Sequence, residues 1–193
     1  MLSVVIATDA DERTLPSTLG ALVAGVVAGM VREVIIAGRR STDATAAIAD
    51  AAGCRLLSLS AGRAARLRAG ADAARGEWLL FLRPGALPDS SWVEETRRFV
   101  QVCEVTGQAA QRAAVFRVEA AGPRPPLREP LNLLRSALRY RSSGGHALVI
   151  AKPLYRRIGG HHDVDEPETD LLRRLGRRRI TRLRTGLIVL PAD

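Results

Sequence analysis

Aromatic residues and lysine are both scarce in this chain of 193 residues. Phe, Trp and Tyr together make up 4 %, so alanine, valine, leucine and isoleucine must fill most of the core. Lys152 is the only lysine, so arginine carries nearly all the positive charge behind a formal net charge of +9. The sequence has neither the aromatic-studded basic strand nor the basic recognition helix of nucleic-acid-binding modules, so no nucleic-acid partner is expected.

Long apolar runs and cysteines are lacking as well. No run of about 18 or more apolar residues is free of charge, so no transmembrane helix is expected. The amino terminus lacks the basic start of a signal peptide, because Ser3–Ile6 leads directly into Asp9 and further acidic residues. Two cysteines, Cys54 and Cys103, are too few for a disulfide scaffold and are expected to be buried thiols. These absences predict a cytoplasmic protein.

Short apolar runs alternate with helical patterns along the first half of the chain. Four buried strands are predicted, over residues 2–8, 33–37, 55–59 and 77–82. The first helix is expected to open at residues 11–14 and to bury Leu15, Leu19, Leu22 and Val26, and two more are predicted over 44–52 and 61–74. This alternation predicts βαβ units and a largely parallel sheet, and the length suits one domain.

The second half of the chain is less regular. A loop with four prolines, residues 122–130, is too short to separate two domains. The pattern around it predicts a helix from Trp92, strands over 113–119 and 147–150, helical segments over 131–140, 153–158 and 168–175, and an extended segment over 180–190.

Five regions follow one another in an order and spacing that are typical of one family. They include SVVIATDADERTLPSTLGAL, EVIIAGRRSTDATAAIADAAG, GRAARLRAGADAARGEWLLFLRPGALPDSSW, GGHALVIAKPLYRRIGG and PETDLLRRLGRRRI. In this order they resemble the nucleotide-sugar-dependent glycosyltransferases of family 2, whose chains commonly open with SVVIPTYNEE and a helix. These motifs are most similar to those of small, single-domain bacterial members of that family.

The resemblance implies a fold and a division of labour. The expected fold is GT-A, a Rossmann-like α/β domain with a mostly parallel sheet flanked by helices, over residues 1–193. Residues 1–92 would form the nucleotide-binding half and residues 93–193 the acceptor-side half. The implied activity is transfer of a sugar from a UDP- or GDP-linked donor to an acceptor that the sequence does not name.

Several acidic residues that the family uses are replaced here. The aspartate that grips the nucleobase corresponds to Gly38, and the metal-binding aspartate after the fourth strand corresponds to Gly85. The acceptor-side Gly-Asp-Gln corresponds to residues 144–146, which end in His146. Only Glu168 keeps a carboxylate at a position that the resemblance marks as catalytic. A divalent metal cofactor is therefore doubtful, and no metal ligands are assigned.

Arginines stand where these residues are lost. The resemblance places five of them around the nucleotide: Arg39, Arg40, Arg66, Arg68 and Arg83. Guanidinium groups bind phosphate in a bidentate way and do not lose their charge, so a few of them can replace a metal ion at a diphosphate. The alternative is that they are solvated loop residues of an arginine-rich protein.

Three further residues belong to the nucleotide side. Asp11 and Glu12 follow the first strand, where family members contact the nucleotide, but they serve equally well as first-turn carboxylates favoured by the helix dipole. Thr8 either faces the same pocket or ends the strand.

The acceptor side supplies the candidates for the catalytic base. Glu168 is the first choice, Asp170 the second, and His146 the third because histidine titrates near neutral pH. The run from His161 to Asp170 is rich in ligand types, but its adjacent histidines point apart and no metal-binding spacing occurs.

Two functions therefore remain open. The first is a glycosyltransferase that uses arginines instead of a metal, with Glu168 as base. The second is a GT-A scaffold that has lost catalysis and binds a nucleotide, another anion or a protein. Self-association or a protein partner is compatible with both.

Overall fold

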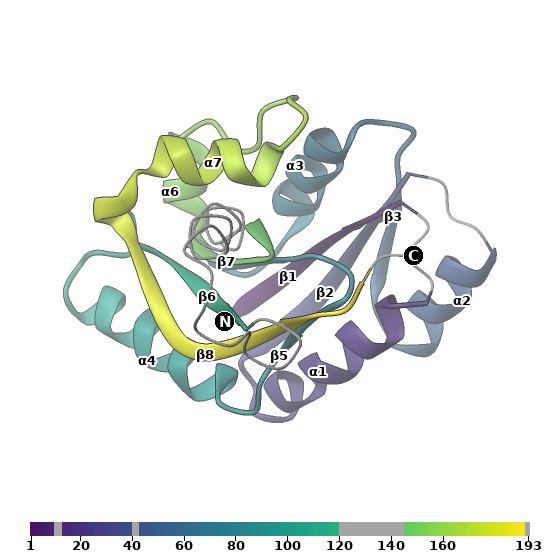
Figure 1. Cartoon of the computed structure of the whole chain (residues 1–193), viewed down its shortest axis with the longest axis horizontal. Coiled ribbons are helices and arrows are strands. Elements are labelled where there is room, and N and C mark those ends of the chain that lie inside the picture. The colour runs from purple at the N-terminus through teal and green to yellow at the C-terminus, as the bar shows by residue number, and fades with distance from the viewer. Residues whose placement is uncertain (10–12, 40–42, 120–144, 192–193) are drawn as a thin grey trace, which may run out of the picture.

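The computed structural model describes residues 1–9, 13–39, 43–119 and 145–191, and Figure 1 presents their arrangement. One eight-stranded sheet runs through these residues in the order β3-β2-β1-β4-β7-β6-β8-β5. The expected α/β fold with a mostly parallel sheet is confirmed. The proline-rich loop and the helix predicted over 131–140 lie outside the described residues.

The first half of the sheet is parallel. β1 lies between β2 and β4, and β2 pairs with the edge strand β3. The elements of this half are β1 (Leu2–Thr8), α1 (Leu15–Val27), β2 (Val31–Gly38), α2 (Asp43–Ala51), β3 (Arg55–Ser58), α3 (Arg63–Ala73) and β4 (Trp78–Leu82). Each predicted element of this half exists, with bounds shifted by a few residues.

The second half of the sheet is mixed. β7 is antiparallel to β4 and β6, β6 is parallel to β8, and β5 is antiparallel to β8. The elements are β5 (Ala86–Pro88), α4 (Trp92–Val105), β6 (Ala113–Glu119), β7 (Ala147–Ala151), α6 (Lys152–Arg157), α7 (Pro167–Leu175), the short 3-10 helix η2 (Arg177–Arg179) and β8 (Ile180–Val189).

Helices cover both faces of the sheet, because side chains of a strand alternate between its two sides. Val4 and Ile6 of β1 pack in one core with residues of α1 and α4, including Leu15 and Trp92. Val5 and Ala7 pack in the other core with residues of α3, α6 and α7. The continuous apolar runs in the sequence therefore reflect strands that are buried on both faces.

Two expectations about burial were wrong. Val26 of α1 is 53 % exposed, because the helix turns Gly25 towards the sheet instead. A Cβ at Gly25 would lie 2.4 Å from the ring of Trp92, so only glycine allows the indole to pack there. Cys103 is buried as expected, but Cys54 is only half-buried. None of the helices in the described ranges has the length and apolarity that a bilayer crossing needs.

The sheet curls on itself at the link between β4 and β5. These strands occupy the fourth and the eighth place in the sheet, yet only residues 83–85 connect them. A chain of this length reaches at most about 14 Å, whereas four strand spacings in a flat sheet amount to about 19 Å. β8 therefore arches across the molecule to bring β5 back beside α1 (Figure 1).

A carboxylate fastens the β5 end of this arch. Asp89 accepts hydrogen bonds from the Thr185 hydroxyl at 2.8 Å and from the backbone N–H groups of Gly186 and Ser91. Burial alone would raise the pKa of Asp89, but these hydrogen bonds outweigh burial and lower the pKa. Asp89 thus ties the turn after β5 to β8.

Candidate functional site

The candidate site lies where several strands reach the same edge of the sheet. The parallel strands β1, β2 and β4 end at Thr8, Gly38 and Leu82, and β7 begins beside Leu82 at Ala147. In open α/β sheets, ligands bind in the crevice beyond the carboxyl ends of the strands. We call this region the donor edge.

Two arginines converge on one carboxylate at the donor edge. Arg63, at the start of α3, donates from Nε to Glu168 Oε1 at 2.8 Å. Arg83, directly after β4, holds Oε1 and Oε2 of the same residue at 3.1 Å each, and it also reaches Glu166 at 3.4 Å. Glu168, in the first turn of α7, is 5 % exposed. The contact therefore joins α3, β4 and α7, which lie far apart in the sequence.

The two guanidinium groups decide the charge of Glu168. Burial alone would raise its pKa, but the charges and hydrogen bonds of Arg63 and Arg83 outweigh burial and hold the pKa below its usual value. The carboxylate is therefore ionised at neutral pH and already engaged on both oxygens. In this arrangement Glu168 is a weak proton acceptor.

A third arginine is built into the floor of the donor edge. Arg66 is 1 % exposed, donates to the carbonyl oxygen of Thr8, and contacts Asp9 Oδ1 at 2.6 Å. Arg63 adds a hydrogen bond of 3.0 Å to the carbonyl of Ala7. These contacts fix the end of β1 against α3. We refer to Arg63, Arg66 and Arg83 as the donor-edge arginines.

Gly85 is the residue that the sequence resemblance aligns with a metal-binding aspartate. Its backbone has a φ of 80°, in the left-handed region that favours glycine. Its N–H donates to the Thr18 hydroxyl at 2.8 Å, and its carbonyl accepts from the N–H of Leu190 at 2.9 Å. A Cβ here would lie 3.3 Å from the Leu190 carbonyl oxygen. The backbone at this position is thus packed between α1 and the end of β8.

The structure brings only some of the predicted site residues together. Gly38 and Thr8 end neighbouring strands, and His146 accepts a hydrogen bond from the Arg83 N–H on its carbonyl at 3.0 Å. Arg39, which follows Gly38 in the sequence, is exposed, and its backbone N–H lies 3.3 Å from the carbonyl oxygen of Thr8. These residues line the same edge as the donor-edge arginines. Asp11, Glu12 and Arg40 lie outside the described residues.

Arg68 and Asp170 make their hydrogen bonds away from the contact of Arg63 and Arg83 with Glu168. Arg68 donates to the carbonyl of His161. Asp170 holds Arg173 at 2.6 Å and Arg174 at 2.7 Å on α7. The hydrogen bond from Arg174 and the neighbouring charges lower the pKa of Asp170. Asp170 thus resembles a structural anchor more than a base.

A buried histidine lies beneath the donor edge. His161 is fully buried, packs edge-on against Phe81 of β4, and its Nδ1 lies 2.8 Å from the Tyr155 hydroxyl. The same hydroxyl accepts the backbone N–H of His161 at 3.2 Å. Burial lowers the pKa of His161 to about 4 and raises that of Tyr155 to about 12. Both groups are therefore neutral at neutral pH.

Sequence reasoning missed two members of this site, Arg63 and Asp9. A signal for Arg63 exists, because it precedes Arg66 by three residues on one helix and residues at that spacing share a face. Asp9 follows the last residue of β1, where polar groups of an open α/β sheet gather, and its ion pair with Arg66 depends on the helix packing.

A sequence profile decides the family. The profile of glycosyl transferase family 2 matches residues 3–157, most of the chain. The chain belongs to glycosyl transferase family 2. No curated protein matches the sequence closely enough to count as a relative.

Three solved structures share the fold of this family 2 member. Glucosyl-3-phosphoglycerate synthase from Mycobacterium tuberculosis, in complex with Mn²⁺ and UDP-Glc, is 21 % identical, with a TM-score of 0.68 over 100 % of this chain and 71 % of its own. A mannosyltransferase from Pyrobaculum calidifontis, in complex with GDP-Man and Mn²⁺, is 17 % identical, with a TM-score of 0.69 over 98 % and 57 %. S. aureus TarS with UDP-GlcNAc is 14 % identical, with a TM-score of 0.69 over 100 % and 59 %.

The described residues of the donor edge do not suit a divalent metal ion of the kind bound by two of those proteins. Hard divalent cations prefer several oxygen ligands, chiefly carboxylates. The sequence resemblance aligns Gly85 with a metal-binding aspartate, and within the described ranges no three His, Cys, Asp or Glu residues group in a way that would hold a metal. The neighbouring carboxylates Asp9 and Glu168 are engaged by arginines.

Proposed function

We propose that this family 2 protein binds a nucleoside-diphosphate sugar at the donor edge and transfers the sugar, with arginines in place of a carboxylate-held metal ion. The observation that carries the proposal is the convergence of Arg63 and Arg83 beyond the ends of β1 and β4. A UDP- or GDP-linked donor is the class of ligand, in line with the complexes of the structural neighbours. The acceptor remains to be identified.

Charge is the first argument for a diphosphate. Leaving-group diphosphate gains negative charge as the sugar bond breaks, and fixed cations nearby lower the energy of that transition state. Arg83 has the necessary access, because 30 % of its side chain is exposed, and Arg63 follows with 23 %. Arg66 is too deeply buried to reach a ligand and instead holds the floor of the site in place.

Competition between anions is the second argument. A diphosphate that binds Arg83 takes over guanidinium N–H groups that now hold Glu166 and Glu168. Once Arg83 turns to the phosphates, Glu168 loses part of the positive charge that lowers its pKa. Its carboxylate then becomes a stronger proton acceptor for an acceptor hydroxyl. Donor binding would in this way prepare the base.

One observation favours the second candidate function, a scaffold that binds but does not transfer. Both oxygens of Glu168 are engaged by arginines, so the best candidate base is unavailable unless the ligand rearranges the site. A nucleotide that binds without displacing Glu168 would leave a binding module without a base. The two functions therefore differ in donor turnover and agree in donor binding.

Calorimetric titration with UDP and GDP tests the binding step, first with Mn²⁺ and then with EDTA. We expect binding that survives EDTA and weakens about tenfold or more in the Arg63→Gln/Arg83→Gln variant, because two charge-assisted contacts are lost. The Arg32→Gln/Arg98→Gln variant is the matched control, since it removes two exposed arginines from other elements. Binding that requires Mn²⁺, or that the control weakens equally, would contradict the arginine site.

Release of UDP or GDP from a panel of nucleotide sugars tests the transfer step. Hydrolysis measures transfer to water, so no acceptor needs to be known. We expect release by the wild-type chain and at least a hundredfold slower release by Glu168→Gln, in the range usual for loss of a general base. Binding without any release would favour the non-catalytic scaffold, and full activity of Glu168→Gln would remove the role assigned to Glu168.

A further inference from the structure

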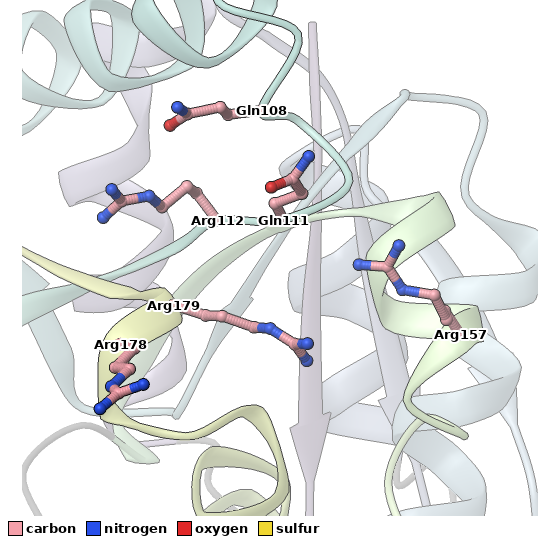
Figure 2. Close-up of a pocket in the computed structure, with 6 residues that line it drawn as sticks. All are labelled: Gln108, Gln111, Arg112, Arg157, Arg178 and Arg179. Carbon is pink, nitrogen blue, oxygen red and sulfur yellow. The ribbon is translucent and has the colours of Figure 1, made fainter.

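A second group of arginines surrounds a pocket far from the donor edge. The pocket has a volume of 440 Å³ and is lined by three segments (Figure 2). The turn between α4 and β6 supplies Gln108, Gln111 and Arg112, the end of α6 supplies Arg157, and η2 supplies Arg178 and Arg179. We call this the far pocket.

The far pocket and the donor edge lie at opposite ends of the sheet. β7 begins at the donor edge, where Ala147 pairs with Leu82. Its other end, at Ile150, pairs with Ala113 at the start of β6, which also pairs with Ile180 at the start of β8. Two of the three lining segments directly precede these starts of β6 and β8, and the third, at Arg157, ends the helix that follows β7. A ligand in the far pocket therefore does not reach the donor-edge arginines.

The described residues do not compensate the charge of the far pocket. Its described lining contains four arginines, two glutamines and no carboxylate. Among the residues that the structure describes, Arg112, Arg178 and Arg179 make no ion pair or side-chain hydrogen bond. Arg157 donates to the carbonyl of Ala110, in the turn that bears Gln108 and Gln111.

Three arginines elsewhere in the described chain each have a carboxylate partner. Arg75 contacts Glu33 at 3.2 Å, Arg97 contacts Glu94 at 3.8 Å, and Arg173 contacts Asp170 at 2.6 Å. Isolated exposed arginines such as Arg32 and Arg98 have no such partner among the described residues, but they do not share a pocket. The far pocket instead gathers like charges around a concave space, which costs electrostatic repulsion unless an anion enters.

The side-chain arrangement suits an oxyanion with several oxygens. In Figure 2, Arg157 and Arg179 extend from opposite sides towards the space beside Gln111, while Arg112 and Arg178 lie on the other flank. Guanidinium groups bind phosphate oxygens in pairs, and glutamine amides add neutral donors. We propose that the far pocket is a binding site for a phosphate-bearing anion, distinct from the nucleotide site.

Two sources can offer that chemistry, a soluble phosphorylated molecule and the headgroup of an anionic phospholipid. Titration with inorganic pyrophosphate at low ionic strength probes the first. Co-sedimentation with phosphatidylglycerol-containing vesicles, compared with pure phosphatidylcholine vesicles, probes the second. Both measurements use the full chain, the Arg178→Gln/Arg179→Gln variant, and Arg32→Gln/Arg98→Gln as a control with the same loss of charge. All four substituted arginines are exposed, so both variants should fold.

We expect Arg178→Gln/Arg179→Gln to lose one bound pyrophosphate per chain, or to bind it about tenfold or more weakly, while the control stays within about twofold of wild type. Pyrophosphate at the donor edge would persist in both variants. Loss of vesicle binding without an effect on pyrophosphate would identify the headgroup as the source. Absence of binding to both probes, or an equal loss in the control, would overturn the proposal.

Discussion

The donor edge and the far pocket contain the same residue type in opposite electrostatic states. At the donor edge, Arg63, Arg66 and Arg83 are matched by Asp9, Glu166 and Glu168. In the far pocket, none of the lining residues that the structure describes is a carboxylate. An anion must displace carboxylates at the first site and only water at the second. Net charge alone, which is +9 for the chain, does not distinguish these two situations.

The difference teaches where arginine stabilises the fold and where it is available to a ligand. A buried guanidinium that donates to backbone and carboxylate oxygens, as Arg66 does, is part of the packing, and its removal leaves unsatisfied partners. An exposed guanidinium without a partner contributes little to stability and remains free to bind.

The largest expected effect is the loss of stability in Arg66→Ala. This change leaves the Thr8 carbonyl without its guanidinium partner and opens a cavity at a side chain that is 1 % exposed. We expect urea unfolding to report a loss of about 2–4 kcal/mol. Arg179→Ala, the far-pocket counterpart, should stay within about 0.5 kcal/mol of wild type. Equal losses of stability in Arg66→Ala and Arg179→Ala would mean that the arginines of the donor edge and of the far pocket do not differ in their contribution to the fold.

Acid should weaken the packed side through His161. Between pH 6.5 and 5 the unfolded chain protonates this histidine, whereas burial keeps it neutral in the fold until about pH 4. The unfolded state therefore binds more protons, and stability falls by about 2 kcal/mol as the pH is lowered across that range. Above pH 6.5 the contribution of His161 to the pH dependence vanishes.

His161→Asn is the variant that isolates this effect, because asparagine keeps an acceptor for the Tyr155 hydroxyl and does not titrate. Its stability should be nearly flat between pH 6.5 and 5, while Arg178→Gln/Arg179→Gln should keep the wild-type slope. Chemical denaturation at a series of pH values measures both. The charged groups that face His161 are Glu168, Arg174, Arg63 and Arg68. An unchanged slope in His161→Asn would assign the acid sensitivity to other groups.

A smaller effect is expected from the competitor at Arg83. Glu166 is 67 % exposed and reaches Arg83 at 3.4 Å, so it is a weak rival of a bound diphosphate. Glu166→Gln should therefore raise UDP affinity about twofold, in keeping with the small energies of exposed ion pairs. Glu94→Gln, at an exposed ion pair on α4, is the control and should leave affinity unchanged. Lower affinity in Glu166→Gln would mean that this carboxylate assists the ligand.

The smallest effect concerns repulsion within the far pocket. Arg178→Gln/Arg179→Gln removes two like charges, so it should raise stability by a few tenths of a kcal/mol at low ionic strength. The gain should disappear in concentrated salt, where screening acts over only about 3 Å. Thermal unfolding with and without salt measures it. A stability loss that persists in salt would indicate a structural role for these arginines.

Most of the fold could be predicted from the sequence because its signals are local. Apolar runs such as Leu2–Thr8 and Trp78–Leu82 are buried on both faces, and such runs are visible without knowledge of their partners. β5 was not predicted, because Ala86–Pro88 is three residues long, contains a proline, and is defined by its pairing with β8 about a hundred residues later. Val26 was placed inside because periodicity could not reveal that Trp92 requires Gly25 beside it.

The candidate site was predictable only in part. The family resemblance assigns Arg83 to the nucleotide side and Glu168 to the acceptor side, and the structure puts the two side chains in contact. The resemblance did not reveal that these residues neutralise one another, because an ion pair across 85 positions depends on how α7 packs against the sheet. The far pocket gave no signal either, since its arginines come from three separate segments.

The hydrogen bonds that join Asp89 to β8 have a consequence for folding during synthesis. It joins residues that are 96 and 97 positions apart, and Leu190 in turn holds the Gly85 carbonyl. Contacts of such long range form only after a large loop has closed, so they come late in folding. During synthesis, the segment between β4 and α4 can form these hydrogen bonds only after β8 has left the ribosome. The donor edge is thus completed only when nearly the whole chain is available.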